Sequence, residues 1–208
     1  MVGKLLEEIL RKASVRNGMD VVYIDELPVN PAVEPDYYKK EGIFFKTPSS
    51  KIYQMFAVDI SEEYLLLKDL YTADPNHTAR PYAFVFGRNE SAQNGSLTKE
   101  GYLLEYIDGR ELLDYISAPK SERRGSDKEI IKQLEAAVSA YRSHRLVHGD
   151  LFMRNILIDR ENHVKIIDPL PEEQSKNIYE KIRNDIDVSR LRRLKAMILS
   201  RTTTDDHN

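Results

Sequence analysis

The sequence contains no cysteine among its 208 residues. Without thiols, disulfide bonds and thiolate catalysis are excluded, and a reducing compartment is expected. No segment approaches the ~20 consecutive apolar residues that a membrane-spanning helix needs. The net charge of -3 provides no overall attraction to nucleic acid or to an anionic membrane. We therefore expect a protein of the cytoplasm, or of the nucleus, with no membrane span and no nucleic acid as its partner.

The composition is that of a folded protein. Hydrophobic residues make up 41% of the chain, enough for a buried core, and charged residues make up 31%. The length allows one sizeable domain or two small lobes. The charged N-terminal segment does not have the apolar core of a secretory signal.

The first half of the chain has mostly strand patterns with embedded helical ones. Apolar spacing predicts an opening amphipathic helix over residues 3–14 and a second helix from about residue 50 to 70. β-branched and aromatic runs predict strands at 19–27, at 36–46 (one long strand, or a hairpin broken near Gly42), and at 82–88 and 101–107, which form a hairpin.

The second half is richer in helix. A helix is predicted to end near His144, with Ser126 or Asp127 as its cap. Two short strands follow, NILID and VKIID, and a last helix is predicted from about Asp185. The two halves differ in character and meet near residues 108–110, which suggests two lobes with a cleft between them.

Three side chains between residues 146 and 169 form a chemical set. Asp150 and Asn155 lie on an irregular loop before the first short strand, and Asp168 ends the second. The hairpin turns the chain back and should bring Asp168 beside Asn155. Magnesium prefers oxygen ligands and takes one or two protein carboxylates. Phosphoryl transfer also needs a carboxylate that orients a hydroxyl and accepts its proton.

At these residues the sequence resembles the protein-kinase-like superfamily, whose catalytic loop reads H-x-D-x-x-x-x-N and whose metal Asp follows a short hairpin. The segment HGDLFMRN matches this pattern. The resemblance implies that Asp150 is the catalytic base, while Asn155 and Asp168 hold Mg2+. His148 would steady the loop without acting as an acid or base.

The resemblance extends upstream to LLEYIDGREL, which is similar to the strand that binds adenine in this superfamily. It implies that Leu104 guards the back of the nucleotide pocket. Glu105 and Ile107 would offer backbone groups to the adenine edge.

In the first half, IFFK ends an apolar strand at Lys46, as the superfamily's phosphate-binding Lys does. Glu63 would pair with it from the following helix. Lys51 and Glu62 are the competing choices. Near the C-terminus, Asp187 resembles a helix Asp that braces the catalytic loop.

The sequence departs from typical regulated protein kinases at several positions. Gly149 replaces an Arg, no Gly-x-Gly-x-x-Gly is present, and Ile-Asp-Pro stands where Asp-Phe-Gly is usual. A phosphate-covering loop must then be non-glycine, within 27–36, or absent. Phe152 stands where many kinases have a phosphate-contacting Lys, and Arg154 is the candidate substitute. HGD looks more like RIO-type kinases, lipopolysaccharide sugar kinases and aminoglycoside phosphotransferases.

The fold implied by the resemblance is α+β, with two lobes. Residues 1–107 would form a strand-rich N-lobe, and residues 108–208 a small helical C-lobe. Only 40 residues (208 minus 168) follow Asp168, which favours a reduced second lobe.

The function implied is transfer of the ATP γ-phosphate to a hydroxyl, with ATP and Mg2+ as cofactors and an atypical serine/threonine protein kinase as the leading class. The acceptor is a protein or a small molecule, so a sugar or antibiotic kinase is an alternative. A non-catalytic ATP-binding scaffold is the second alternative. A metal nuclease is discounted, because it leaves the resemblance to the adenine-binding strand unexplained. His77, His144 and His163 are predicted to be surface residues, and RLRRLK (190–195) a solvated helix face.

Overall fold

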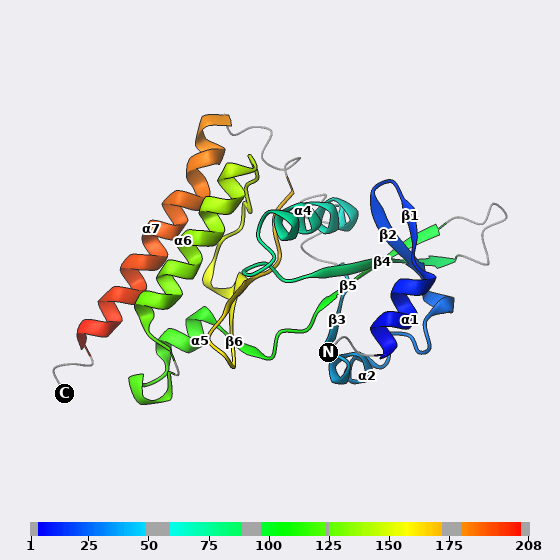
Figure 1. Cartoon of the computed structure of the whole chain (residues 1–208), viewed down its shortest axis with the longest axis horizontal. Helices are drawn as coiled ribbons and strands as arrows, with labels where there is room; N and C mark the ends of the chain where they lie inside the picture. The colour runs from blue at the N-terminus through cyan, green and yellow to red at the C-terminus, as the bar shows by residue number, and fades with distance from the viewer. Residues whose placement is uncertain (1–3, 49–58, 89–96, 124, 172–179, 205–208) are drawn as a thin grey trace. The chain divides into compact units, whose positions relative to one another are not determined.

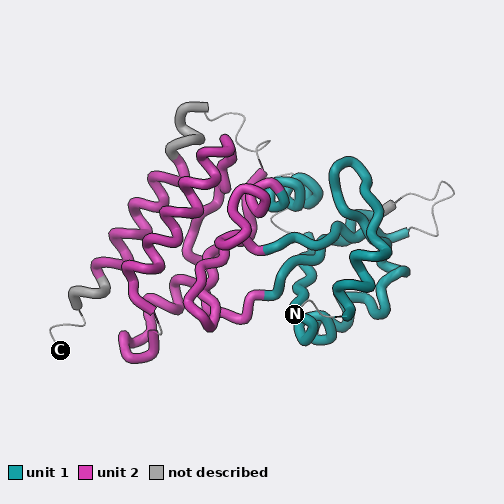
Figure 2. Tube along the Cα trace, in the orientation of Figure 1, with its two compact units in different colours: residues 1–68, 80–106 teal, residues 69–79, 107–208 magenta. Residues whose placement is uncertain are grey.

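The computed structural model describes residues 4–48, 59–88, 97–123, 125–171 and 180–204 (Figure 1). The chain forms two compact units (Figure 2). Unit 1 comprises Met1–Lys68 and Arg80–Tyr106, and unit 2 comprises Asp69–Ala79 and Ile107–Asn208. The second unit therefore includes a segment from the first half of the chain. The assignment of the units to functional lobes stays a prediction.

Unit 1 is built on a five-stranded sheet with the order β1-β2-β4-β5-β3. Helix α4 (Ile60–Ala73) begins in unit 1 and ends in unit 2. The other elements of unit 1 are α1 (Lys4–Lys12), β1 (Ser14–Arg16), β2 (Met19–Tyr23), the 3-10 turn η1 (Ile24–Glu26), α2 (Pro35–Lys40), β3 (Ile43–Lys46), β4 (Pro81–Arg88) and β5 (Leu97–Glu105).

The strand pairing places Lys46 at the edge of this sheet. β4 and β5 form the antiparallel hairpin that the sequence predicts. β3 pairs antiparallel with β5, so that Lys46 stands opposite Tyr102. At the other edge, β1 and β2 form an antiparallel pair, and β2 runs parallel to β4.

The prediction of a strand or hairpin over residues 36–46 is wrong in its first half, where the chain forms helix α2. Pro35 stands at the start of this helix, where its fixed φ angle suits a first helical residue. Tyr38 is fully buried, and its hydroxyl donates to the Val29 carbonyl over 2.6 Å. Gly42 then turns the chain with a φ of 75°. Burial of the tyrosine overrides its preference for strands.

Helix α1 covers the sheet with the apolar face that the sequence predicts. Its buried residues Leu5, Leu6 and Ile9 join a cluster with Val22, Leu27, Tyr38, Ile43, Ala83, Val85 and Leu103. Because β2 ends at Tyr23 and a 3-10 turn follows, the predicted strand over 19–27 is shorter than expected. Leu27 still packs into the same core.

Unit 2 combines helices with the three-stranded sheet β6-β7-β8. β7 and β8 form the predicted antiparallel hairpin. The Ser126 hydroxyl caps helix α6 by accepting from the Glu129 N–H over 3.1 Å, as predicted. The elements are β6 (Gly109–Glu111), α5 (Leu112–Ser117), η2 (Lys120–Glu122), α6 (Asp127–Ser143), η3 (Met153–Asn155), β7 (Ile156–Asp159), β8 (Val164–Ile166) and α7 (Glu180–Thr204).

The long helix α7 runs beside α6 in unit 2 (Figure 1). It begins at Glu180, earlier than the predicted start near Asp185. Leu191, Leu194 and Ile198 are its buried apolar residues. Within the described ranges, no helix combines the length and the apolar character needed to cross a bilayer. The predicted α+β class is confirmed, with strands concentrated in unit 1 and helices in unit 2.

Candidate functional site

Asp150 lies on the loop between α6 and η3, and Asn155 fixes its position. The Asn155 amide nitrogen donates to the Asp150 main-chain carbonyl over 2.8 Å and to its Oδ2 over 2.7 Å. The Phe152 N–H also donates to that carbonyl over 2.8 Å. The Asp150 side chain remains 21% exposed, so its carboxylate is both held and reachable.

His148 is fully buried behind this loop, and its two ring nitrogens have different roles. Nε2 lies 2.9 Å from the Ile167 carbonyl, and the Asp150 N–H lies 3.3 Å from Nδ1. A carbonyl can only accept and an N–H can only donate, so the imidazole must be neutral with its proton on Nε2. Burial lowers the pKa of His148, which agrees with the neutral form. His148 therefore supports the loop, as the resemblance implies.

Asp187, on helix α7, anchors the same loop from another side. Its two carboxylate oxygens accept the His148 N–H over 2.7 Å and the Gly149 N–H over 3.2 Å. The carboxylate is buried, with 3% of the residue exposed. The predicted bracing contact is present, and hydrogen bonds to a charged acceptor are stronger than neutral ones.

Gly149 has a φ of 76°, in the left-handed region that favours glycine. A Cβ at this position would lie 2.9 Å from the Leu170 carbonyl oxygen. The Leu170 N–H in turn donates to the His148 carbonyl over 2.9 Å. The glycine therefore lets the loop that carries Asp150 approach the segment that follows Asp168.

Asp168 follows β8, where the Ile167 N–H donates to the Asn155 carbonyl over 2.9 Å. This bond joins the two chain segments that carry the predicted metal ligands. Asp168 has a φ of 57°, an uncommon value for a residue with a side chain. Such backbone strain is concentrated at functional sites. Asp150 and Asp168 also both act electrostatically on the imidazole of His148.

The donor set of this region fits a hard divalent cation. Because the Asn155 nitrogen faces Asp150, its Oδ1 points elsewhere, and within the described residues no donor reaches that oxygen. Asp168 adds a carboxylate, and oxygen ligands with one or two carboxylates suit Mg2+. In the described part of the chain, no group of three or more His, Asp or Glu side chains is placed to hold a metal ion.

In unit 1, Lys46 and Glu63 form the predicted ion pair. Lys46 Nζ lies 2.5 Å from Glu63 Oε1, and the two side chains are 17% and 6% exposed. The Tyr102 hydroxyl donates to the same Oε1 over 2.5 Å. Its ring centroid lies 6.0 Å from Lys46 Nζ. The phosphate-binding role of Lys46 stays a prediction, and Lys51 lies outside the described residues.

The start of α4 places Glu63 for this pair. Asp59 Oδ1 accepts the Ser61 N–H over 2.9 Å, and the Asp59 carbonyl accepts the Glu63 N–H over 3.2 Å. Burial alone would raise the pKa of Asp59, but the hydrogen bonds from Lys99 and Ser61 outweigh it and the pKa is lowered. A charged Asp at the helix N-terminus is favourable.

The predicted adenine-binding strand, 101–107, coincides with the end of β5 only as far as Glu105, and Ile107 follows the strand. Leu104 is buried, with 3% exposed. The Glu105 N–H donates to the Arg80 carbonyl over 2.8 Å, so this donor is already used. The Ile107 carbonyl accepts the Gly109 N–H over 3.0 Å. Among the described residues, the Ile107 N–H has no partner and remains available for a ligand.

Sequence reasoning missed the contribution of Arg190. It belongs to the run predicted as a solvated helix face, yet its side chain is only 21% exposed and its guanidinium donates to the Gly149 carbonyl. Arg192 and Arg193 are exposed, as predicted. The i, i+3 spacing from Asp187 is the signal that could have shown it.

His77 also differs from its prediction as a surface residue. Its side chain is 17% exposed, and Nδ1 lies 2.7 Å from Asp74 Oδ2. His144 and His163 are exposed, as predicted.

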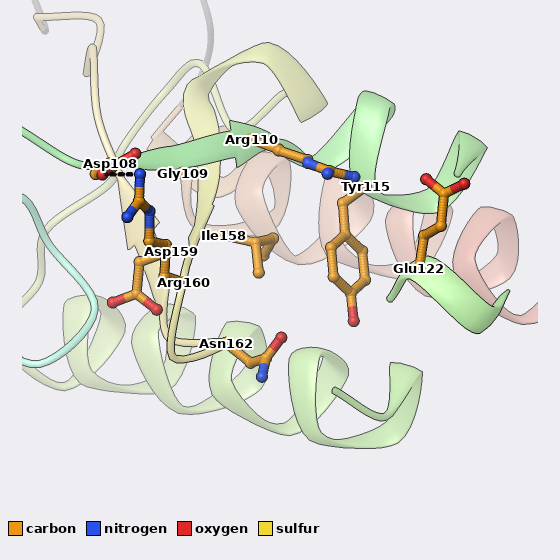
Figure 3. Close-up of a pocket in the computed structure, with 9 residues that line it drawn as sticks. All are labelled: Asp108, Gly109, Arg110, Tyr115, Glu122, Ile158, Asp159, Arg160 and Asn162. Atoms are coloured by element: carbon orange, nitrogen blue, oxygen red, sulfur yellow. Dashed lines mark ion pairs between the residues drawn. The ribbon is translucent and has the colours of Figure 1, made fainter. Parts of the chain in front are cut away.

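A separate pocket of about 350 Å³ lies within unit 2 and does not include any of the predicted site residues (Figure 3). Its rim carries the ion pair between Arg160 and Asp108, at 2.7 Å. Arg110 extends over Tyr115 on one side, and Glu122 stands at the far end (Figure 3). The pocket mixes charges of both signs and lies on the sheet edge formed by β6.

Comparison with known families identifies similarity to the protein kinase domain over residues 93–169. This segment is less than half of the chain. It includes Leu104, Glu105, Ile107, Asp150, Asn155 and Asp168, and it does not include Lys46 or Glu63.

Curated relatives agree with this similarity. Protein kinase kin1 of Schizosaccharomyces pombe is 32% identical over 79 residues, which are 37% of this chain and 9% of the relative. A probable serine/threonine-protein kinase KIN1 homolog of Encephalitozoon cuniculi is 40% identical over 68 residues, covering 32% and 12%. CBL-interacting protein kinase 21 of Oryza sativa is 32% identical over 88 residues, covering 40% and 17%. The chain thus spans a small fraction of the relatives it matches.

Over residues 93–169 the chain is therefore similar to protein kinase domains, and the relatives that match this part of the chain are named as protein kinases. The α+β architecture with its five-stranded sheet is consistent with a kinase-like fold. The matched segment contains the loop that carries Asp150 and Asn155.

Proposed function

We propose that this protein transfers the γ-phosphate of ATP to a hydroxyl group, with Asp150 as the catalytic base. The observation that carries the proposal is the catalytic loop of unit 2. There, Asn155 holds the Asp150 carboxylate, Asp187 accepts the N–H groups of His148 and Gly149, and the His148 ring accepts the N–H of Asp150. A proton acceptor must be held in place before it can orient an attacking hydroxyl.

Asp150 would accept the proton of the acceptor hydroxyl. Its Oδ2 already accepts from the Asn155 amide, which restricts rotation of the carboxylate. Asn155 Oδ1 and the Asp168 carboxylate would hold Mg2+. When bound, this ion supplies positive charge to the transferring phosphoryl group.

Unit 1 would contribute the cation that contacts the ATP phosphates. Glu63 accepts from both the Lys46 ammonium and the Tyr102 hydroxyl, so the ammonium is held at one place beside the Tyr102 ring. For adenine, Leu104 would provide an apolar contact, and Glu105 and Ile107 would provide backbone groups.

A protein hydroxyl is the acceptor that the comparisons favour, because the named relatives are serine/threonine or other protein kinases. We further propose an atypical kinase of the RIO-like or sugar-kinase-like kind. The reasons are Gly149, whose left-handed backbone would strain an Arg, and the Ile-Asp-Pro sequence at Asp168. Two other results are possible in the experiment below: phosphate transfer to sugars or antibiotics, and ATP binding without phosphate transfer.

The test compares wild-type protein with Asp150→Asn, and with Asp114→Asn, an exposed control on α5. Transfer of labelled γ-phosphate is measured to mixed protein acceptors and to small hydroxyl compounds, and MgATP binding is measured by calorimetry. We expect turnover by the wild type, an Asp150→Asn turnover reduced by about 100-fold or more, and unchanged binding. MgATP binding without any turnover would favour a scaffold, and absence of binding would refute the proposal.

A further inference from the structure

Helix α7 contacts the catalytic loop through two side chains of opposite charge. Asp187 accepts the N–H groups of His148 and Gly149. Arg190, one turn further along, donates to the Gly149 carbonyl. The same helix face therefore binds both the donors and the acceptor of one short backbone segment.

Arg190 also reaches the side chains beyond this backbone. Its Nη1 lies 3.9 Å from Asp150 Oδ1, and its guanidinium carbon lies 4.3 Å from the centre of the Phe152 ring. A planar guanidinium can donate hydrogen bonds and stack on an aromatic ring at the same time. Beside Asp150, Arg190 donates a hydrogen bond to the Gly149 carbonyl and lies over the Phe152 ring.

A second arginine approaches the same base and the same ring. Arg154 Nη2 lies 3.2 Å from Asp150 Oδ2, and its guanidinium carbon lies 5.2 Å from the Phe152 ring centre. Arg154 is 67% exposed, whereas Arg190 is 21% exposed. Arg154 makes the shorter contact with the carboxylate, but an ion pair of so exposed a side chain contributes little, and Arg190 is the more buried of the two partners.

Two guanidinium groups repel each other unless an anion lies near both. Here each approaches a different oxygen of the Asp150 carboxylate. The exposed Phe152 ring gives both cations a further surface. Packing of α7 against the loop would need neither the carboxylate contact nor the ring contact.

We propose that Arg190 is a positioning residue that sets the orientation of the Asp150 carboxylate, with Phe152 as the surface on which its guanidinium rests. The inference depends on the proposed role of Asp150. It assigns to α7 control over the side-chain orientation of the base, in addition to the backbone anchoring by Asp187.

The test uses Arg190→Gln, Arg190→Lys and Phe152→Leu, with Arg193→Gln as the matched control. Arg193 is exposed on the same helix. For each variant, kcat, KM for ATP, the Kd of MgATP and the melting temperature are measured. Hydrogen exchange of residues 146–155 is followed without nucleotide, so that one readout does not depend on activity.

For Arg190→Gln we expect a kcat lower by about 10- to 100-fold. This factor corresponds to the loss of one charged hydrogen bond, the one that Arg190 donates to the Gly149 carbonyl. The Kd of MgATP should stay within about twofold, and loop exchange should be faster. Arg190→Lys should restore part of kcat, because an ammonium can reach the carbonyl but cannot stack in the same way. Phe152→Leu should lower kcat by less.

A kcat for Arg190→Gln equal to that of Arg193→Gln would overturn the inference. An Arg190→Gln variant whose kcat and affinity for MgATP fall by the same factor would overturn it as well. If wild-type protein transfers no phosphate to any acceptor, the proposed function fails instead. The hydrogen-exchange comparison then still decides whether Arg190 orders the loop.

Discussion

In unit 2, the loop that carries Asp150 is fixed at three consecutive residues by His148, Asp187 and Asn155. In unit 1, Lys46 is held at the end of an edge strand by Glu63. The loop is held by hydrogen bonds to its backbone groups, whereas Lys46 takes part in a buried ion pair between two side chains. Removal of an anchor should therefore destabilise the loop, whereas replacement of Lys46 should lower the affinity of the protein for its ligand.

The largest effect is expected from Asp187→Ala. The change leaves the buried His148 N–H and the partly buried Gly149 N–H without their charged acceptor, which should cost about 3–5 kcal/mol of unfolding free energy. Chemical denaturation measures this loss. The control is Asp127→Ala, which removes another buried carboxylate of unit 2, paired with Arg123.

Hydrogen exchange separates the two variants. Only Asp187→Ala should accelerate exchange at residues 148–150. Equal acceleration in both variants would mean that Asp187 stabilises unit 2 generally and does not anchor this loop.

Lys46→Met tests the unit 1 side of the comparison. Loss of a charged hydrogen bond to phosphate should lower the affinity for MgATP by about 10- to 100-fold. Calorimetric titration measures the affinity, and Lys39→Met, which removes an exposed lysine of α2, is the control. An unchanged affinity would show that another residue contacts the phosphates.

A pair of glycine substitutions compares backbone geometry in the two units. Gly149→Ala and Gly42→Ala both place a side chain at positive φ, 76° and 75° respectively. Each should cost about 1–2 kcal/mol from the left-handed conformation. Only Gly149→Ala adds the close approach to Leu170, because nothing lies within 4 Å of a Cβ at Gly42.

Denaturant unfolding of both variants measures the difference. We expect Gly149→Ala to be the less stable protein and the one with reduced turnover. Equal stabilities would mean that the loop can move away from Leu170 without cost.

The smallest effect concerns pH. His148 has an ordinary pKa of 6.5 in the unfolded chain, and burial lowers its pKa in the folded state. Below 6.5 the unfolded chain binds a proton that the folded protein does not, so stability is full above this pH and falls as the pH decreases. The slope from this residue is at most about 1.4 kcal/mol per pH unit.

The measurement is denaturant unfolding at several pH values between about 5 and 7. His148→Gln should remove this part of the slope, while replacement of exposed His163 by Gln should leave it. A His148→Gln slope equal to that of the wild type would contradict the neutral, buried imidazole.

The contact between Asp150 and Asn155 could be predicted from sequence because it depends on local spacing. Asp150 and Asn155 are close along the chain, and the hairpin that returns Asp168 is short and strongly patterned. Helix α2 could not be predicted in the same way, because its tyrosines favour strands and only the burial of Tyr38 decides the outcome. Arg190 was missed because a run of basic residues does not show which one faces inward.

The most direct test of the account is where a divalent cation binds. Mn2+ can replace Mg2+ with ADP, and its paramagnetism broadens the NMR signals of nearby backbone amides. We expect the strongest broadening at Asn155 and Asp168, and its loss in Asp168→Asn. Broadening centred on other residues, such as the rim of the pocket at Asp108, would contradict it.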